Sequence, residues 1–331
     1  MNGMNDMKAY HAGGLAAAAL LAVLAPTTTP AQAQQWPARA VRIVVPFQPG
    51  GGTDIQARLL ARKLTENLGQ SFVVDNRRGA GGLIGAEIVA KAPPDGYSLL
   101  FSSASLTVNV TLYKKIAFDP IRDLAPVSLF SSAPLVLVVH PSVPVKTVKE
   151  LVALAKQQKG KLNAGSNGAG TTSHLAIEML KQSAGIEVTH VPYKGGGPAV
   201  IAMMAGEIDM RFAGALAVLP YVKQGRVKPI AVASLRKSAV MPDLPTIAST
   251  YPGFDADNWY AMFAPAAVSK DIIARLHSEI VKVLNTADMR DVIAKDGAEP
   301  VGSSPEELAA YFRREVEKYA KVIKAANVRV E

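Results

Sequence analysis

The sequence predicts an α/β fold of two units, in which parallel strands alternate with helices that cover both faces of each sheet. Three observations predict it. Short β-branched runs alternate with amphipathic segments from residue 41 to 103, and the alternation restarts after residue 134. Four glycine-rich stretches separate strand ends from helix starts. A length of 331 residues with 49% apolar content is enough for the cores of two ordinary units.

The first unit begins with a strand at 41–47 and a helix after the glycines that follow it. The apolar face of this helix is predicted to contain Ile55, Leu59, Leu60, Leu64 and Leu68, with Gly69 as its C-terminal cap. The remaining elements are a strand at 71–76, a helix within 79–92 and a strand at 97–103.

The second unit begins with a strand at 134–141, followed by a capping box in which Thr147 and Glu150 open a helix that runs to about Gln158. Strands are then predicted at 161–166, 186–193, 208–214 and 228–234, with helices within 167–182, 194–207 and 215–225.

The C-terminal part contains an extended aromatic stretch at 252–266 and helices at 270–284 and 305–326, the last capped by Ser303 or Ser304. Two helices are too few for a core of their own. If they dock on the first unit, the chain crosses between units near 130–136 and again near 252–262. The predicted domains are therefore 34–134 with 256–331 (domain I) and 135–255 (domain II).

Residues 1–33 have the features of a secretory signal peptide: Lys8, an apolar run at 12–25, and a cleavage motif at Ala31-Gln32-Ala33. The mature chain is expected to begin at Gln34 and to reside in the periplasm. The sequence has no cysteine, which excludes disulfides and a lipid anchor on a cysteine. No later segment has the ~18 uninterrupted apolar residues of a membrane helix.

The formal net charge is +9, but the basic residues are scattered, and the sequence therefore does not predict a nucleic-acid-binding surface. A diffuse positive field raises the local concentration of small anions. The sequence contains no HExxH motif, EF-hand loop or carboxylate cluster of metal type, and neither metal nor cofactor is expected.

Four junctions, at 47–54, 79–85, 166–173 and 193–198, share the order strand end, glycine-rich loop, helix start. Glycine lets successive backbone N–H groups turn toward one point, and the helix N-terminus adds partial positive charge there. Two such junctions in each unit suit a small ligand with a carboxylate at each end. The alternative interpretation is that the glycines only allow close packing of helix on strand.

Three enzyme patterns are incomplete. Thr171 stands where a Walker A motif requires lysine, and Ile84 occupies the third glycine position of a dinucleotide fingerprint. The segment AGSNG around Ser166 differs from the nucleophile-elbow pattern G-x-S-x-G at one position, where Ala164 replaces the first glycine. A serine hydrolase built on Ser166, with His277 after an acid such as Asp209, remains the alternative function.

The segments PFQPGGGTDIQARLLARKL, GAGGLIGAEIVAKAPPDGYSLLF, HVPYKGGGPAVIAMMAGEID and PDLPTI resemble, in order and spacing, the Bug family of periplasmic solute-binding receptors. These receptors serve tripartite tricarboxylate transporters. The resemblance implies a two-domain periplasmic-binding-protein (flytrap) fold with two crossing hinge strands. It also implies an organic anion ligand, held largely by backbone amides, and no catalytic activity.

The resemblance assigns ligand-binding roles to twelve positions: Phe47, Gly50, Gly51, Gly52, Asp54, Ser102, Ser103, Gly170, Thr171, Thr172, His174 and Tyr193. Family members often carry Phe-Asp and a polar residue where this chain has Phe212, Ala213 and Gly214. The change implies a wider cleft, and Ala213 and Gly214 join the expected site. A dicarboxylate or a flatter, aromatic carboxylate against Phe47, Tyr193 and Trp259 is expected.

The predicted function is therefore a monomeric periplasmic receptor that closes about its hinge on a small organic anion. The expected partners are the membrane permease subunits of a tripartite tricarboxylate transporter. A ligand sensor for a membrane kinase is a further alternative.

Overall fold

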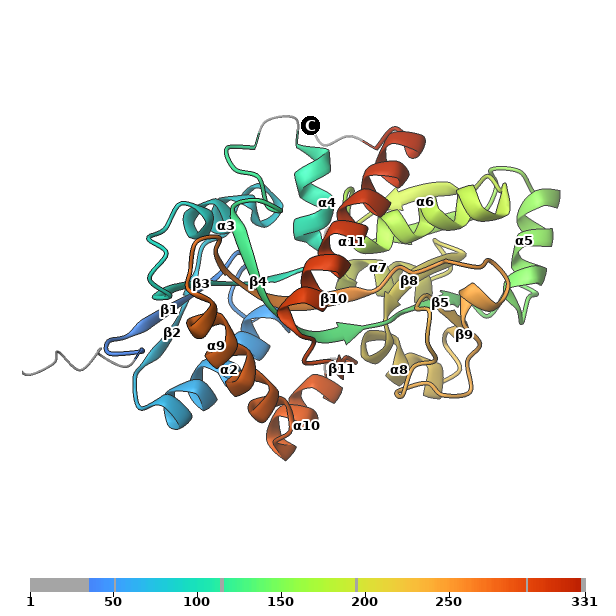
Figure 1. The fold of residues 1–331 in the computed structure, drawn as a ribbon. Helices are drawn as coiled ribbons and strands as arrows, with labels where there is room; N and C mark the ends of the chain where they lie inside the picture. Colours follow the sequence, from blue (N-terminus) through green and yellow to red (C-terminus); the bar gives the residue numbers. More distant parts are fainter. Residues whose placement is uncertain (1–35, 51, 114–115, 194–195, 296, 329–331) are drawn as a thin grey trace, which may run out of the picture. The chain divides into compact units, whose positions relative to one another are not determined.

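Two β-sheets organise the chain, and their strands alternate with helices along most of the sequence (Figure 1). The computed structural model describes residues 36–50, 52–113, 116–193, 196–295 and 297–328. The chain up to Ala38 is a separate unit from Arg39–Glu331, and the fold given below is that of the second unit. The predicted signal peptide, 1–33, lies outside the described residues.

The first sheet has the strand order β11-β4-β10-β3-β1-β2. Strand β1 is parallel to β2 and β3, whereas β10 is antiparallel to β3 and β4, and β11 is antiparallel to β4. The strands are β1 (Val41–Val45), β2 (Phe72–Asn76), β3 (Ser98–Ser103), β4 (Leu124–Ala133), β10 (Asn258–Pro265) and β11 (Glu299–Pro300).

The second sheet has the strand order β7-β6-β8-β5-β9. Strand β6 is parallel to β7 and β8, and β5 is antiparallel to β8 and β9. The strands are β5 (Leu135–Val139), β6 (Asn163–Ser166), β7 (Thr189–Pro192), β8 (Met210–Gly214) and β9 (Lys228–Val232).

The two-sheet α/β fold is confirmed, but the expectation of purely parallel sheets is wrong. The chain leaves the first sheet after β4, enters the second at β5, and returns from β9 to β10. A segment that leaves and one that returns run in opposite directions, and β4 and β10 are accordingly antiparallel neighbours.

Helices fill the connections within each sheet. Those of the first sheet and the C-terminal part are α2 (Gly52–Leu68), α3 (Leu83–Ala90), α4 (Ser105–Leu112), α9 (Lys270–Leu284), α10 (Ala287–Lys295) and α11 (Pro305–Ala326). Those of the second sheet are α5 (Val148–Gln157), α6 (Thr172–Ala184), α7 (Gly196–Met204) and α8 (Ala215–Lys223). Short 3₁₀ turns occur at η1 (Ala80–Gly82) and η2 (Ile247–Ser249). The sequence did not predict α4 or α10.

The apolar face predicted for α2 is wrong at Ile55, which is 49% exposed. The neighbouring Gln56 points inward instead and is fully buried, because its Oε1 accepts a hydrogen bond of 2.7 Å from the Ser131 hydroxyl. A buried amide is tolerated when it has such a partner, and residues 55 and 56 cannot both face the sheet.

Ser304, one of the two caps considered for the last helix, forms a capping box with Glu307. The Glu307 N–H donates to Ser304 Oγ at 3.1 Å, and the Ser304 N–H donates to the Glu307 carboxylate at 2.8 Å. At α5, Thr147 caps the helix as predicted, but Glu150 accepts from the N–H of Lys146.

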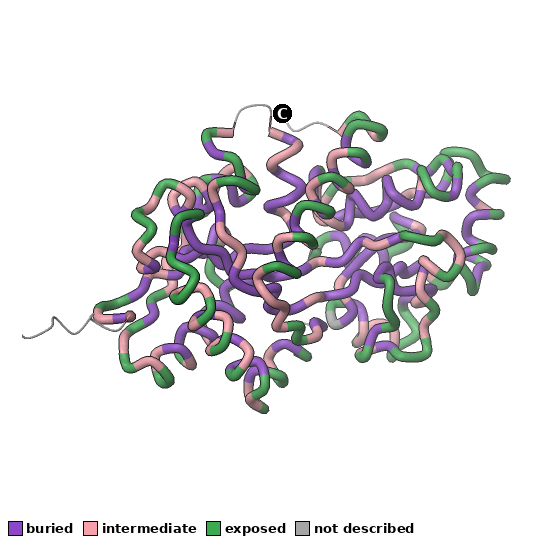
Figure 2. The backbone as a smooth tube through the Cα atoms, in the orientation of Figure 1, coloured by how far each residue is buried: buried purple, intermediate pink, exposed green. Residues whose placement is uncertain are grey.

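Helix α11 packs against the apolar interiors of both sheets. Leu308 and Phe312 belong to the cluster around β10, whereas Tyr319 and Ile323 belong to the cluster around β5 and α6. The buried path of the strands and the alternating burial along α11 are visible in Figure 2. Helix α11 thus has no core of its own and completes the apolar clusters of both sheets.

Candidate functional site

A cavity of about 760 Å³ is lined from both sheets and from the segments that cross between them. Its lining residues are Phe47, Gly81, Ser105, Asn109, Tyr113, Ala133, Leu135, Asn167, Ala169, Gly170, Thr171, Thr172, Gly214, Ala217, Asn258, Tyr260 and Lys295. Among these described residues Lys295 carries the single formal charge, and no Asp or Glu is present. The remaining polar groups are amides, hydroxyls and backbone. This composition suits an anion with a carbon frame.

The two crossing segments contribute residues from paired strands. Ala133 on β4 is the register partner of Asn258 on β10, and both line the cavity. Leu135, which begins β5, and Tyr260 extend the same surface. A change in the angle between the sheets would therefore act directly on cavity walls.

On the side of the first sheet, the cavity is lined by the ends of two loops and by α4. The Asn109 amide donates to the carbonyl of Gly81 at 2.9 Å. Gly81 has a left-handed φ of 62°, and a Cβ atom there would lie 2.3 Å from Asn109 Nδ2. Helix α4 also supplies Ser105 and, just beyond its end, Tyr113.

In the first glycine loop, Asp54 holds the backbone and does not line the cavity. It is 3% exposed, and its carboxylate accepts from the Gly50 N–H, Arg58 Nε and Asn76 Nδ2, each at 2.9 Å. Burial alone would raise the pKa of Asp54, but these hydrogen bonds outweigh it and lower the pKa. Of the loop's other predicted residues, Phe47 lines the cavity, Gly52 begins α2, and Gly51 lies outside the described residues.

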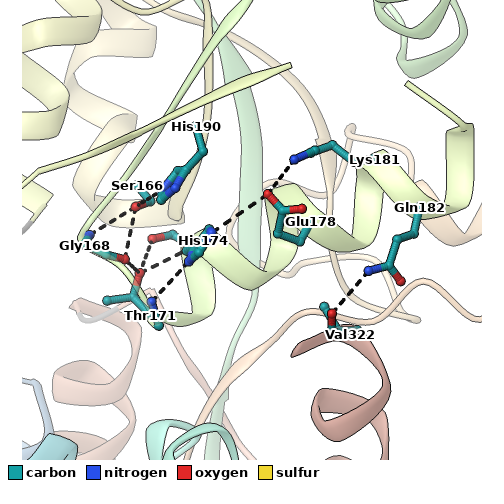
Figure 3. Close-up of polar contacts among 11 residues, drawn as sticks. Ser166, Gly168, Thr171, His174, Glu178, Lys181, Gln182, His190 and Val322 are labelled. Atoms are coloured by element: carbon teal, nitrogen blue, oxygen red, sulfur yellow. Dashed lines mark hydrogen bonds and ion pairs between the residues drawn. The ribbon is translucent and has the colours of Figure 1, made fainter. Parts of the chain in front are cut away.

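The loop between β6 and α6 carries three predicted residues into the cavity wall: Gly170, Thr171 and Thr172. Thr171 caps α6, since its hydroxyl accepts from the His174 N–H at 3.4 Å and donates to the Gly168 carbonyl at 2.7 Å. The Gly170 N–H donates to His174 Nδ1 at 3.1 Å. Figure 3 shows His174 beside Thr171 in this loop. His174 therefore supports this loop and does not itself line the cavity.

Behind this loop two imidazole rings stack, those of His174 and His190, with centroids 3.8 Å apart. Burial lowers the pKa of each ring to about 4, and for His174 the Lys181 ammonium adds to the effect. For His190 the neighbouring ring adds to it. Both rings are neutral near pH 7, and Nδ1 of His174 is free to accept the Gly170 hydrogen bond.

Ser166 forms a hydrogen bond with a histidine, but not with the one that the sequence favoured. Its Oγ lies 2.7 Å from His190 Nε2, whereas His277 is on α9. Ser166 is fully buried, and its hydroxyl also contacts the N–H and carbonyl of Gly168 at 3.1 Å each. A serine with these contacts ties the loop to β6.

The other predicted positions lie near the cavity wall or behind it. Gly214 lines the cavity at the start of α8, whereas Ala213 is buried in the apolar cluster beside it. Ser102 and Ser103 end β3 and are buried; the Ser103 hydroxyl contacts that of Ser105 at 2.9 Å. The side chain of Tyr193 does not line the cavity; its N–H donates to the Ser166 carbonyl at 3.1 Å. Gly50 is likewise not a lining residue.

The expected contact from Trp259 is wrong. Its side chain is fully buried and packs edge-on against Tyr311 and Phe312. Successive strand residues point to opposite faces, and β10 therefore directs the next residue, Tyr260, to the cavity. Phe47, Tyr113 and Tyr260 are its aromatic residues.

Sequence reasoning missed the residues of α4, the amides Asn167 and Asn258, and Lys295. Asn167 lies within the third glycine junction, and that position was the available signal. The segment SLTVNVTL gives no amphipathic helical pattern, and no signal in it identified α4.

In the part of the chain that the structure describes, no three His, Cys, Asp or Glu residues are arranged to hold a metal ion. Within the same residues, every helix is too short or too polar to cross a membrane.

Two mixed sheets, double crossing strands and a cavity lined from both sheets define the class of periplasmic binding proteins. Residues 56–328 match the profile of the family described as "Tripartite tricarboxylate transporter family receptor", and the chain belongs to this family of periplasmic solute-binding receptors. Protein BugT of Bordetella pertussis is 35% identical over 320 residues, which cover 96% of this chain and 98% of BugT. The expected membership of the Bug family is confirmed.

Solved structures agree with this assignment. "R. palustris Rpa4515 with adipate" has a TM-score of 0.74 and 35% identity, covering 89% of this chain and 99% of that protein. MatC from Rhodopseudomonas palustris with bound malate has a TM-score of 0.70 and 31% identity, covering 87% and 100%.

Proposed function

We propose that this protein captures a small organic carboxylate in the cavity between its sheets and delivers it to a tripartite tricarboxylate transporter. The observation that carries the proposal is the cavity lining: amides, hydroxyls and glycine-loop backbone, one lysine and no acidic residue. The relatives solved with adipate and malate support a dicarboxylate. The rings of Phe47, Tyr113 and Tyr260 suit the ligand's carbon frame.

The proposed contacts on the side of the first sheet are Phe47, Ser105 and Asn109. On the side of the second sheet they are Asn167, the Gly170–Thr172 backbone and Gly214, with Asn258 and Tyr260 on the crossing strand. Asp54, His174, Ser103, Tyr193 and Ala213 are proposed to hold these segments in place. Gly50, Gly51, Gly52 and Ser102 remain predicted contacts.

We propose domain boundaries at 134/135 and 255/256. The change of sheet between β4 and β5 and between β9 and β10 supports them. The domains are proposed to close about these crossings, and the protein is proposed to act as a monomer without catalytic activity. Its partners would be the permease subunits of the transporter. Cleavage after Ala33 would release the mature protein into the periplasm. Mass spectrometry of the intact protein from the periplasm tests this cleavage, and the expected mass is that of a chain that begins at Gln34.

A thermal-shift screen tests the ligand class. The panel contains succinate, malate, adipate, citrate and benzoate, with matched amides and amines as controls. A ligand at 100 times its Kd adds about 2.7 kcal/mol to the free energy of unfolding, and carboxylates are expected to raise the melting temperature. If only amines or neutral compounds stabilise the protein, the proposed ligand class is wrong.

A further inference from the structure

Arg211 on β8 is a buried arginine with neutral partners. Its side chain is 1% exposed. The guanidinium donates from Nη1 to the Gly196 carbonyl at 3.2 Å and from Nη2 to Asn167 Oδ1 at 2.9 Å, and Nε has no hydrogen-bond partner. Among the residues that the structure describes, none forms an ion pair with it.

A buried charge of this kind is costly to the fold. Taking a cation out of water without a counter-charge costs several kcal/mol, and burial lowers the pKa of Arg211 to about 10. At neutral pH the group is still charged. Uncompensated buried charges are found preferentially at functional sites, where a ligand can supply the opposite charge.

Arg211 does not line the cavity itself but is hydrogen-bonded to Asn167, which does. A guanidinium has only donors, so the amide oxygen of Asn167 must face it and the amide nitrogen must face away. No hydrogen bond is made by Asn167 Nδ2 to any described residue, and Asn167 lines the cavity. The pair thus presents a fixed N–H donor to the cavity, with a positive charge directly behind it.

We propose that Asn167 and Arg211 form a carboxylate subsite on the side of the second sheet. Asn167 donates to a carboxylate oxygen of the ligand. Arg211 is the positioning residue: it fixes the amide and supplies the charge that favours an ionised carboxylate over a neutral amide of the same shape. The proposal rests on the proposed function, because it assigns one end of the same carboxylate ligand.

The test compares two ligands that differ by one charge. Calorimetric titration with adipate and with its monoamide gives the ratio of their affinities, and succinate or malate with its monoamide replaces this pair if adipate does not bind. Arg211→Met removes the charge at similar volume. We expect Arg211→Met to lower dicarboxylate affinity at least tenfold. The variant should then bind the dicarboxylate and its monoamide with similar affinities. Arg211→Lys retains the charge and should recover part of the ratio.

Asn167→Asp is the second variant, and it does not depend on Arg211→Met remaining folded. A carboxylate at this position would pair with Arg211, so the ligand-free protein should melt at a higher temperature while dicarboxylate affinity falls about 100-fold or more. Asn167→Ala should lose affinity without the rise in melting temperature. Arg226→Met, which removes an exposed arginine from the same sheet's connections, is the charge-matched control and should leave the ratio unchanged.

The outcomes separate the two proposals. If the wild-type protein binds none of the carboxylates of the thermal-shift panel, the proposed ligand class fails and the subsite fails with it. If the wild type binds but folded Arg211→Met keeps the wild-type ratio, Arg211 is only structural and the inference is overturned. An Asn167→Asp protein that retains dicarboxylate affinity overturns it as well.

Discussion

The imidazole of His174 stacks on that of His190 with an interplanar angle of 6°, and each ring also makes a hydrogen bond at one end of the loop between β6 and α6. His174 accepts from Gly170. His190 contacts Ser166 (Figure 3). Both contacts are made by neutral rings, because burial lowers both pKa values to about 4. The hydrogen bond from Gly170 therefore requires that Nδ1 of His174 remain unprotonated.

We expect the two histidines to destabilise the fold as the pH falls from about 6.5 to about 4. In this window the unfolded chain, with a histidine pKa of 6.5, binds protons that the folded protein does not. Each ring contributes a slope of up to about 1.4 kcal/mol per pH unit, with stability rising toward neutral pH. Chemical denaturation at pH 4.5, 5.5 and 7 measures how the free energy of unfolding changes with pH.

The matched variant is the double change His174→Asn and His190→Gln. Asn can place an acceptor where Nδ1 of His174 lies, and the Gln side-chain amide can place a hydrogen-bonding group where Nε2 of His190 lies, but neither titrates. The difference in unfolding free energy between variant and wild type should shift in favour of the variant as the pH falls. A difference that stays constant from pH 7 to 4.5 would show that the rings do not act in this way.

Glycine spacing was enough to predict several segments of the cavity wall. The third junction placed Gly170, Thr171 and Thr172 at the start of a helix after a strand, and a backbone anion site follows from that order alone. The first junction identified Phe47 and the second the neighbourhood of Gly81. In these loops the glycine pattern marks segments whose residues line the cavity.

Helix α4 could not be predicted because its helical state depends on tertiary contacts. The segment is rich in Thr and Val, which have low intrinsic helix propensity, and its pattern is typical of a strand. In the structure Val108 and Leu112 pack into the apolar cluster that also contains Tyr319 of α11, some 200 residues later in the chain. For the same reason, no pattern in the segment indicated that Asn109 lines a cavity.

Gly81→Ala is expected to abolish ligand binding. The backbone at Gly81 has a left-handed φ of 62°, and the new Cβ would lie 2.3 Å from Asn109 Nδ2. Either the loop or α4 must move, at a cost of about 1 to 3 kcal/mol in unfolding free energy. Thermal shift with and without the best carboxylate measures both effects.

The control for this change is Gly69→Ala. Gly69 follows α2 with a similar φ of 70°, but nothing lies within 4 Å of its Cβ position, and it does not line the cavity. It should lose comparable backbone stability and keep ligand binding. Wild-type affinity in Gly81→Ala would mean that this segment does not shape the site.

Ser166→Ala is expected not to change the rate of ester hydrolysis, because the wild-type protein should not hydrolyse esters. Ser166 is fully buried, and a substrate cannot reach its hydroxyl. The loss of its contacts with His190 and Gly168 should lower the free energy of unfolding by about 1 to 2 kcal/mol. Incubation with a p-nitrophenyl ester measures turnover; activity that disappears in the variant would support the hydrolase alternative.

Asp257→Asn is expected to stabilise the protein above pH 7, with the opposite sign to the histidine pair. Burial, followed by the charge of Asp255, raises the pKa of Asp257 to about 7, so the folded state holds a proton that the unfolded state releases near pH 3.8. Wild-type stability at this group therefore falls as the pH rises between these values. Asn cannot ionise and can still accept from Ser132, which in the wild type donates to Asp257 at 2.8 Å.

At pH 8 the free energy of unfolding of Asp257→Asn should exceed that of the wild type by at least about 1 kcal/mol, whereas at pH 4 the two values should converge. Asp271→Asn, at an exposed position on α9, is the control; an equal effect there would assign the change to net charge.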